Sequence, residues 1–167
     1  MKIDRGVNSD GRHWVQLSQA LAIEKIAECM GLLESKRQIS PCAEGIKLRK
    51  TRDGDKLPEY DWEYASILGG VMYVANTTRP DIAYATSRLT RYLKSPNDSH
   101  CVALKRLVRY LYHTREVGVR YTGGGDNPFR LSAAADASFA DCEDTKRSTL
   151  GWCQWLGDMD NGDISWG

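Results

Sequence analysis

The sequence predicts an α+β fold in which strands at both ends of the chain flank a helical middle. Residues 1–18 favour a β-hairpin, because VNSDG supplies turn residues and RHWVQL alternates apolar and polar side chains. Residues 60–114 repeat apolar side chains at helical spacing. Residues 129–166 hold three short strand-like runs separated by polar segments, which indicates strands in hairpin order.

The N-terminal hairpin is expected to lead into a first helix. Ser18 is placed to cap this helix, which should run to about Met30. Gly31 stands where a glycine commonly ends a helix. Residues 34–57 have no periodicity and are rich in charged residues, Gly and Pro, so we expect a long connecting loop.

The helical middle begins with a segment over residues 60–75. Its Gly69 and Gly70 should each cost roughly 1 kcal/mol of helix stability relative to alanine, so we expect close packing against another backbone. A third segment over residues 98–114 places Cys101, Leu104, Val108 and Leu111 on one face; this set should point into the core.

Between these two segments, the tetrapeptide TRPD predicts the start of another helix. Thr78 and Asp81 match a T-x-x-D capping box, and Pro80 falls in the first turn, where no backbone N–H is needed. Asp81 would also meet the positive end of the helix dipole. Only Arg79 is left without a role in this interpretation.

The C-terminal strands should follow a boundary at residues 122–128, TGGGDNP. Strands are expected at residues 129–138, 150–157 and 163–166, with a loop over residues 139–149. The acidic residues of that loop are expected to be solvated. They are Asp141, Glu143 and Asp144.

Composition predicts a soluble, intracellular chain, placed in the cytoplasm, with no membrane partner. The 167 residues suffice for one compact domain or two small ones. The five cysteines are odd in number and widely spaced, which favours free thiols in a reducing compartment over disulfides or a zinc site. No apolar run is long enough to cross a bilayer or to form a signal peptide.

Charge is unevenly distributed along the chain. Residues 79–121 carry nine Lys or Arg and three Asp or Glu, whereas residues 122–167 carry three and eight. The outward faces of the second and third middle helices should each present a basic stripe able to contact phosphates, although such stripes can also be ordinary solvated surface. The candidate nucleic-acid-binding residues are Arg88, Arg91, Lys94, Lys105, Arg106 and Arg109.

Catalytic motifs are scarce. The sequence contains no P-loop, no H-E-x-x-H and no G-x-S-x-G. Asp136, at the end of an apolar strand, is the carboxylate best placed to bind a divalent metal, but two-metal phosphodiester hydrolysis needs several converging acids. His100 and His113 lack companions at metal-ligand spacing.

Four segments resemble the part of copia-type LTR retrotransposon polyproteins that joins the reverse transcriptase to RNase H. They are LSQALAIEKIAECMG (17–31), YASILGGVMYVANTTRPDIAYATSRLTRYLKSPNDSH (64–100), LKRLVRYLYHTREVGVRY (104–121) and DASFADCEDTKRSTLGW (136–152). The resemblance implies that residues 1–57 hold the end of the palm hairpin, a thumb helix and a loop. Residues 58–122 would form a helical connection region, and residues 129–167 the first strands of a truncated RNase H-like domain.

The same resemblance implies RNA-directed DNA synthesis and RNA-strand cleavage by the intact protein. Its partners would be an RNA–DNA hybrid and the rest of the Pol polyprotein. Asp136 would match the first metal-binding, catalytic aspartate of RNase H, with Mg²⁺ as the cofactor of the parent enzyme. A non-catalytic remnant and a stand-alone nucleic-acid-binding module stay open as alternatives.

The chain departs from the family pattern at both active sites. The Tyr-x-Asp-Asp turn of the polymerase is absent, and the later RNase H acids would lie beyond Gly167. Ser138 and Phe139 stand where the family usually has a second acid and a tryptophan. We therefore expect neither catalysis nor tight Mg²⁺ binding by this chain alone.

Overall fold

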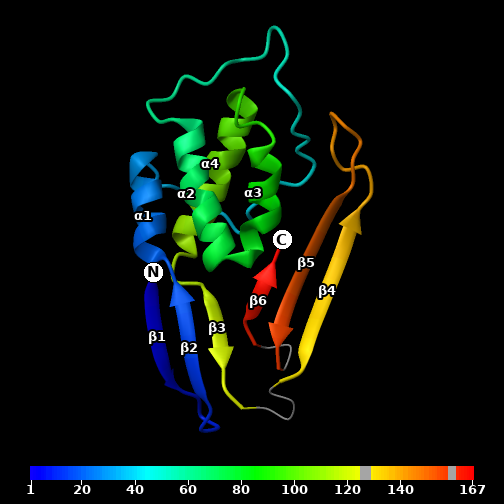
Figure 1. Cartoon of the computed structure of the whole chain (residues 1–167). Coiled ribbons are helices and arrows are strands. Elements are labelled where there is room, and N and C mark those ends of the chain that lie inside the picture. The colour runs from blue at the N-terminus through cyan, green and yellow to red at the C-terminus, as the bar shows by residue number, and fades with distance from the viewer. Residues whose placement is uncertain (125–128, 158–160) are drawn as a thin grey trace.

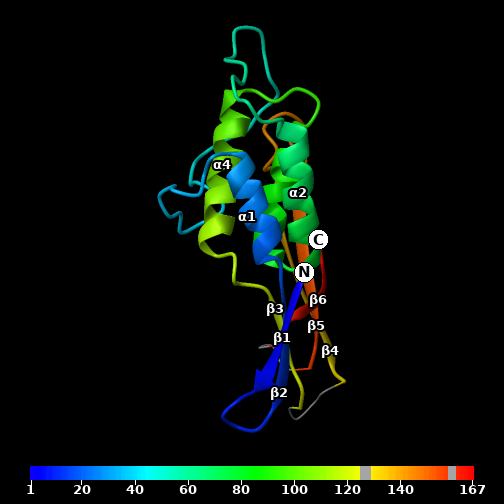
Figure 2. The ribbon, with the colours of Figure 1, turned by 90° about the vertical axis from the view of Figure 1, so that its left-hand side faces the viewer.

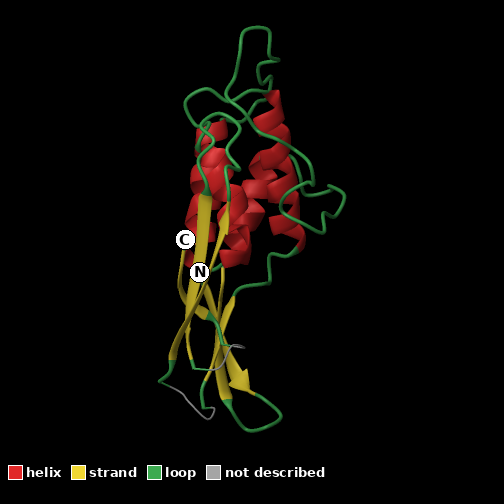
Figure 3. Ribbon diagram, turned by 90° about the vertical axis from the view of Figure 1, so that its right-hand side faces the viewer, coloured by secondary structure: helices red, strands yellow, loops and turns green. Residues whose placement is uncertain are grey.

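A computed structural model describes residues 1–124, 129–157 and 161–167, and it consists of helices and two small antiparallel sheets (Figure 1). In chain order the elements are β1 (Lys2–Val7), β2 (His13–Ser18), α1 (Ala20–Cys29), α2 (Tyr64–Thr77), the 3₁₀ turn η1 (Pro80–Ile82), α3 (Ala83–Thr90), α4 (Asp98–His113), β3 (Val119–Thr122), β4 (Leu131–Ser138), β5 (Thr149–Leu156) and β6 (Asp163–Trp166). The helices gather at one end of the molecule, and strands project beyond them at the other (Figure 3).

The predicted hairpin is confirmed, and it gains a third strand that the sequence did not reveal. The first sheet has the order β1-β2-β3, with Trp14 of β2 opposite Thr122 of β3. Gly118 makes this pairing possible, because a Cβ atom there would collide with the carbonyl oxygen of Leu17. The strand after α4 therefore returns to the N-terminal hairpin.

The first helix ends as predicted but begins differently. Ser18 is the last residue of β2, and Gln19 occupies the N-cap position without a side-chain capping bond, so the prediction that Ser18 caps α1 is wrong. Gly31 adopts a φ of +63°, as expected of a glycine that ends a helix. Residues 34–57 contain no helix or strand, as predicted.

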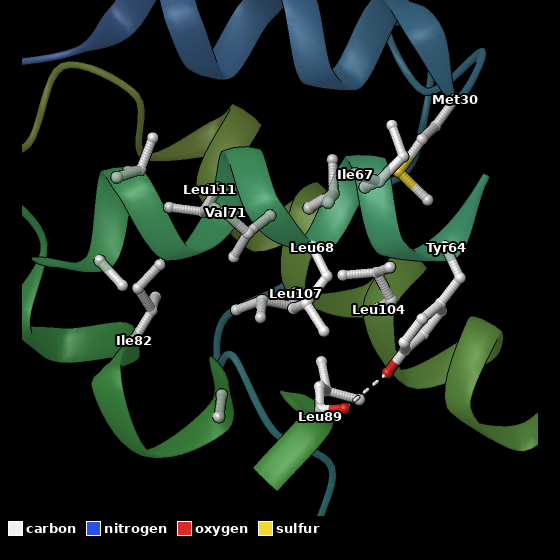
Figure 4. Packing of buried hydrophobic residues seen from close by; sticks show 14 of the residues in the cluster. Met30, Tyr64, Ile67, Leu68, Val71, Ile82, Leu89, Leu104, Leu107 and Leu111 are labelled. Carbon is white, nitrogen blue, oxygen red and sulfur yellow. Dashed lines mark hydrogen bonds between the residues drawn. The ribbon is translucent and has the colours of Figure 1, made fainter. Parts of the chain in front are cut away.

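The helices enclose one apolar core. Helix α1 packs against both α2 and α4 (Figure 2), and Leu68, Leu104 and Leu111 are completely buried among them (Figure 4). The close packing against another backbone that was expected at the glycine pair is not found, because the only near neighbour among the described residues is a side chain. A Cβ on Gly70 would lie 3.0 Å from Cδ1 of Ile26, whereas one on Gly69 would meet nothing within 4 Å.

The predicted capping box at the start of α3 is wrong. The hydroxyl of Thr78 donates to Oε1 of Gln19 at 2.8 Å, and no side chain caps η1 or α3. Asp81 instead accepts two hydrogen bonds from Arg79, at 2.8 and 2.7 Å. The guanidinium of Arg79 also donates to the carbonyl and hydroxyl oxygens of Thr114 at the end of α4. Arg79, which the sequence left without a role, therefore joins η1 to α4.

Hydrogen bonds join the second sheet, β4-β5-β6, and its loop to the helices. Nε1 of Trp166 in β6 donates to the carbonyl of Ala75 at 2.9 Å. The acidic residues of the loop before β5 were predicted to be solvated, and this is wrong for Glu143 and Asp144, which contact the loop over residues 34–57. Asp144 accepts from the backbone N–H of Lys50, and Glu143 pairs with Lys47 at 2.8 Å.

Candidate nucleic-acid interface

The two helices that carry the basic candidates are fixed by their own ends and by the core. Helix α4 begins with a capping box, in which the Asn97 side chain accepts from the backbone N–H of His100 and His100 Nδ1 accepts from the backbone N–H of Asn97. His100 is buried, and its ring stacks on that of Tyr92 with the ring centres 4.1 Å apart. We conclude that His100 stabilises the start of α4. Buried Leu89 anchors α3, and the Tyr64 hydroxyl donates to its carbonyl (Figure 4).

Three of the six basic candidates meet at one pocket, which we call the arginine pocket. Arg88 of α3 and Arg106 and Arg109 of α4 line it, together with residues of the loop over 34–57. It encloses about 190 Å³. Its other lining residues are Gln38, Pro41, Cys42, Ala43, Ile46, Leu48, Ala85, Leu89, Val102 and Ala103.

The electrostatics of this pocket are one-sided. None of its lining residues, all within the described ranges, is an Asp or a Glu. Burial raises the pKa of the Cys42 thiol, and Arg88 and Arg106 offset that rise only in part, so the thiol is neutral at neutral pH. The pocket thus presents positive charge against apolar walls.

Two of the arginines also have unused hydrogen-bond donors. The Nε atoms of Arg106 and Arg109 are buried and have no acceptor in the described part of the chain. One terminal nitrogen of Arg106 donates to Oγ of Ser40 at 3.0 Å, which fixes the orientation of that guanidinium. Buried donors are normally satisfied, so these two atoms are exceptions within the described part of the chain.

The other three candidates lie apart from the pocket. Arg91 donates to the hydroxyl of Thr149 in β5 at 2.8 Å. Nζ of Lys105 lies 3.8 Å from the ring centre of Tyr60, and Lys94 is exposed. The structure therefore brings together Arg88, Arg106 and Arg109, and it distributes the rest over neighbouring surface.

None of the six candidates forms an ion pair with a carboxylate among the residues that the structure places. The ion pairs found there involve other cations, such as Arg49 with Asp55 and Arg79 with Asp81. Sequence reasoning missed the contribution of Ser40 and Cys42 to the pocket. Their loop has no periodicity, so no local signal placed it over α3 and α4.

Asp136 lies on β4, opposite Gly151, and is exposed. Its Oδ1 accepts the backbone N–H of Ala137 at 2.8 Å. Within residues 1–124, 129–157 and 161–167, no three His, Cys, Asp or Glu side chains are grouped so that they could hold a metal ion. The residues present thus do not fit the Mg²⁺ site that the resemblance implies.

Helices able to span a membrane are also absent from the described ranges, because none is both long and apolar enough. His113 contacts the carbonyl oxygen of Ser35 through Nε2 at 2.8 Å. Both histidines considered from sequence therefore make structural contacts within the fold: His100 at the start of α4, and His113 with the loop over residues 34–57.

Comparison with known proteins finds relatives among transposon polyproteins. The chain is 39% identical over 135 residues to the "Retrovirus-related Pol polyprotein from transposon RE2" of Arabidopsis thaliana, a match that covers 81% of this chain and 9% of that protein. It is 36% identical over 152 residues to the corresponding RE1 polyprotein of the same plant, covering 91% and 10%. The TNT 1-94 polyprotein of Nicotiana tabacum is 34% identical over 154 residues, covering 90% and 11%.

The chain thus spans about a tenth of the length of these three polyproteins. No family model and no solved structure matches it.

Proposed function

Because this chain belongs to the retrovirus-related Pol polyproteins of copia-type transposons, we propose that it is a piece of a reverse transcriptase and RNase H polyprotein that contacts nucleic acid. The intact protein would carry out RNA-directed DNA synthesis and cleave the RNA strand of the hybrid. Residues 1–122 would supply the end of the palm, the thumb and the connection. Residues 129–167 would begin the RNase H-like domain.

The observation that carries the nucleic-acid role is the unneutralised charge of α3 and α4. In the part of the chain that the structure describes, the six basic candidates have no carboxylate partners, although carboxylates neutralise cations elsewhere in the fold. Arginine and lysine charges that are not already paired can replace the counterions of a nucleic-acid backbone. This contact reads no sequence, which suits a protein that must move along a template.

Catalysis belongs to the intact parent in this proposal. Mg²⁺ would be held there by Asp136 together with acids that this chain does not contain. Among the described residues Asp136 belongs to no group of side chains that could hold a metal ion, so this piece is proposed to contribute binding rather than chemistry.

A salt titration of binding to an RNA–DNA hybrid tests the proposal. Arg88, Arg91, Arg106 and Arg109 are replaced together by glutamine. We expect weaker binding, with the slope of log affinity against log salt falling by about one unit for each phosphate that the variant no longer neutralises. The matched control replaces four exposed cations, Lys25, Lys36, Arg37 and Arg52, by glutamine. Circular dichroism checks that both variants fold.

Equal affinities and equal salt slopes for the two quadruple variants would contradict the nucleic-acid role. The basic faces of α3 and α4 would then be ordinary solvated surface. That result would favour a non-catalytic remnant.

A further inference from the structure

We propose that the arginine pocket binds the terminal phosphate of a nucleotide, carried either by a free nucleoside monophosphate or by the phosphorylated end of an unpaired strand. The phosphate site rests on the pocket itself. The choice of a nucleotide as the carrier of that phosphate rests on the function proposed above.

Charge is the first argument for a phosphate. Three arginines from two helices line a partly enclosed space of about 190 Å³ with no acid in its lining. Like charges held together in a partly apolar site repel one another unless an anion compensates them. A terminal phosphate carries about −1.5 to −2 at neutral pH, against −1 for a phosphate within a strand. The terminal group is therefore the better match.

Hydrogen bonding is the second argument. The buried Nε atoms of Arg106 and Arg109 both lack acceptors among the residues that the structure describes. Guanidinium groups pair with phosphate oxygens through two parallel N–H donors, a geometry that commonly uses Nε. Ser40 holds Arg106 in place without occupying that Nε. Two of the arginines that line the pocket thus have donor capacity that the described residues do not use.

The apolar walls indicate what the phosphate is attached to. Ile46 and Val102 line the pocket and are 43% and 50% exposed, and Leu89 closes it from α3. A phosphate within a duplex is flanked by further phosphates and leaves such walls uncovered. A single unpaired nucleotide can lay its sugar and base against them. The volume holds several water molecules, and so a phosphate with part of its nucleoside.

Calorimetric titration of the full chain with AMP, with inorganic phosphate and with adenosine tests the site. We expect AMP to bind more tightly than either fragment. Arg109→Gln should weaken AMP binding about tenfold or more, since it removes a charged donor. Arg88→Gln, on helix α3, should also weaken AMP binding. It replaces Arg109→Gln in the test if that variant does not fold. Lys25→Gln, exposed on α1, is the matched control and should bind AMP as the wild type does.

A separate variant, at Ile46, tests the contribution of the apolar wall to binding. Ile46→Ser should weaken binding of AMP and leave binding of inorganic phosphate unchanged. Unchanged AMP affinity in this variant would overturn the nucleoside part of the proposal. Absence of saturable AMP binding at millimolar concentration, or equal AMP affinity in wild type and Arg109→Gln, would overturn the site altogether.

Two further ligands distinguish a free nucleotide from a strand end as the carrier of the phosphate. A single-stranded oligonucleotide with a 5′-phosphate is compared with the same strand bearing a 5′-hydroxyl. Tighter binding of the phosphorylated strand, abolished in Arg109→Gln, assigns the site to strand ends. Binding of AMP without that preference assigns it to free nucleotides. Neither measurement uses a hybrid duplex, so its outcome is distinct from that of the salt titration.

Discussion

The helical body, residues 1–122, and the distal sheet, β4–β6, are held together in different ways. The helical body has one continuous core drawn from α1, α2, α3 and α4. In the distal sheet Trp155 is buried, but β4 is exposed along most of its length and Leu131 is 62% exposed. The helical body can thus support its own fold, whereas the distal sheet depends on polar contacts with it.

The largest expected effect comes from truncating the core. Leu104→Ala should lower the free energy of unfolding by about 2–5 kcal/mol, because Leu104 is completely buried and its removal leaves a cavity. Leu131→Ala makes the same chemical change on β4 and should cost about 0.5 kcal/mol or less. Urea unfolding of both variants measures the difference. Similar losses would mean that the distal sheet has a core of its own.

The next largest effect concerns Arg79, which is 1% exposed. Arg79→Met should lower the free energy of unfolding by about 3 kcal/mol, since it leaves the Asp81 carboxylate without its charged partner and removes the two hydrogen bonds from Arg79 to Thr114. Arg49→Met removes a more exposed pair with Asp55 and should cost about 1 kcal/mol or less. Urea unfolding again gives both values. A cost for Arg79→Met no greater than that for Arg49→Met would contradict the assigned link between η1 and α4.

The same link should make stability depend on pH. Burial raises the pKa of Asp81, but hydrogen bonds and charge from Arg79, with a hydrogen bond from Tyr110, outweigh it and hold the pKa below its ordinary value. The folded state therefore binds this proton less readily than the unfolded state. Its stabilisation is fully present above the unfolded pKa of about 3.9 and is lost as pH falls through the folded value.

Asp81→Asn should therefore destabilise the chain more at pH 7 than at pH 3. Urea unfolding at the two pH values checks this, with the exposed Asp53→Asn as the control. A loss that is the same at both pH values would show that the Asp81 carboxylate has no special partner in the folded state.

The core of the helical body could be predicted from sequence because its pattern is local. Leu104 and Leu111 are spaced at helical intervals, and both are buried as expected. The pairing of β3 with β2 could not be predicted from the sequence, because it joins segments about a hundred residues apart and β3 has only four residues. At TRPD the capping-box prediction failed because Asp81 can interact either with the start of the helix or with Arg79. Contacts with Thr114 and Tyr110 from distant α4 favour its pairing with Arg79.

The candidate site was predictable only in part, for the same reason. The basic side chains of α3 and α4 are visible as stripes in the sequence. The pocket that Arg88, Arg106 and Arg109 share is completed by an aperiodic loop, which supplies Cys42 to its lining and Ser40 as a hydrogen-bond partner of Arg106. Periodicity carries no information about where such a loop folds back.

A smaller effect is expected at Thr78, within the helical body. Thr78→Val keeps the shape of the side chain but removes the hydroxyl that donates to Gln19, so it should cost about 1 kcal/mol in urea unfolding. Thr78→Ser keeps the hydroxyl and should preserve most of that hydrogen bond. Binding to a hybrid should be unchanged in both. Equal stability of the valine variant and the wild type would show that this buried hydrogen bond contributes nothing net.

Trp166 should have the smallest effect on global stability. It also gives the most direct test of the contrast between the helical body and the distal sheet. Its indole N–H donates to the carbonyl of Ala75 and ties β6 to α2. Trp166→Phe removes that donor and keeps an aromatic ring. The loss of about 1 kcal/mol should raise amide exchange in β5 and β6 roughly fivefold, because the distal sheet opens as a unit. Exchange in α2 and α4 should stay as in the wild type, because their core is intact. Faster exchange in α4 as well would mean that the two regions unfold together, and the contrast between them would fail.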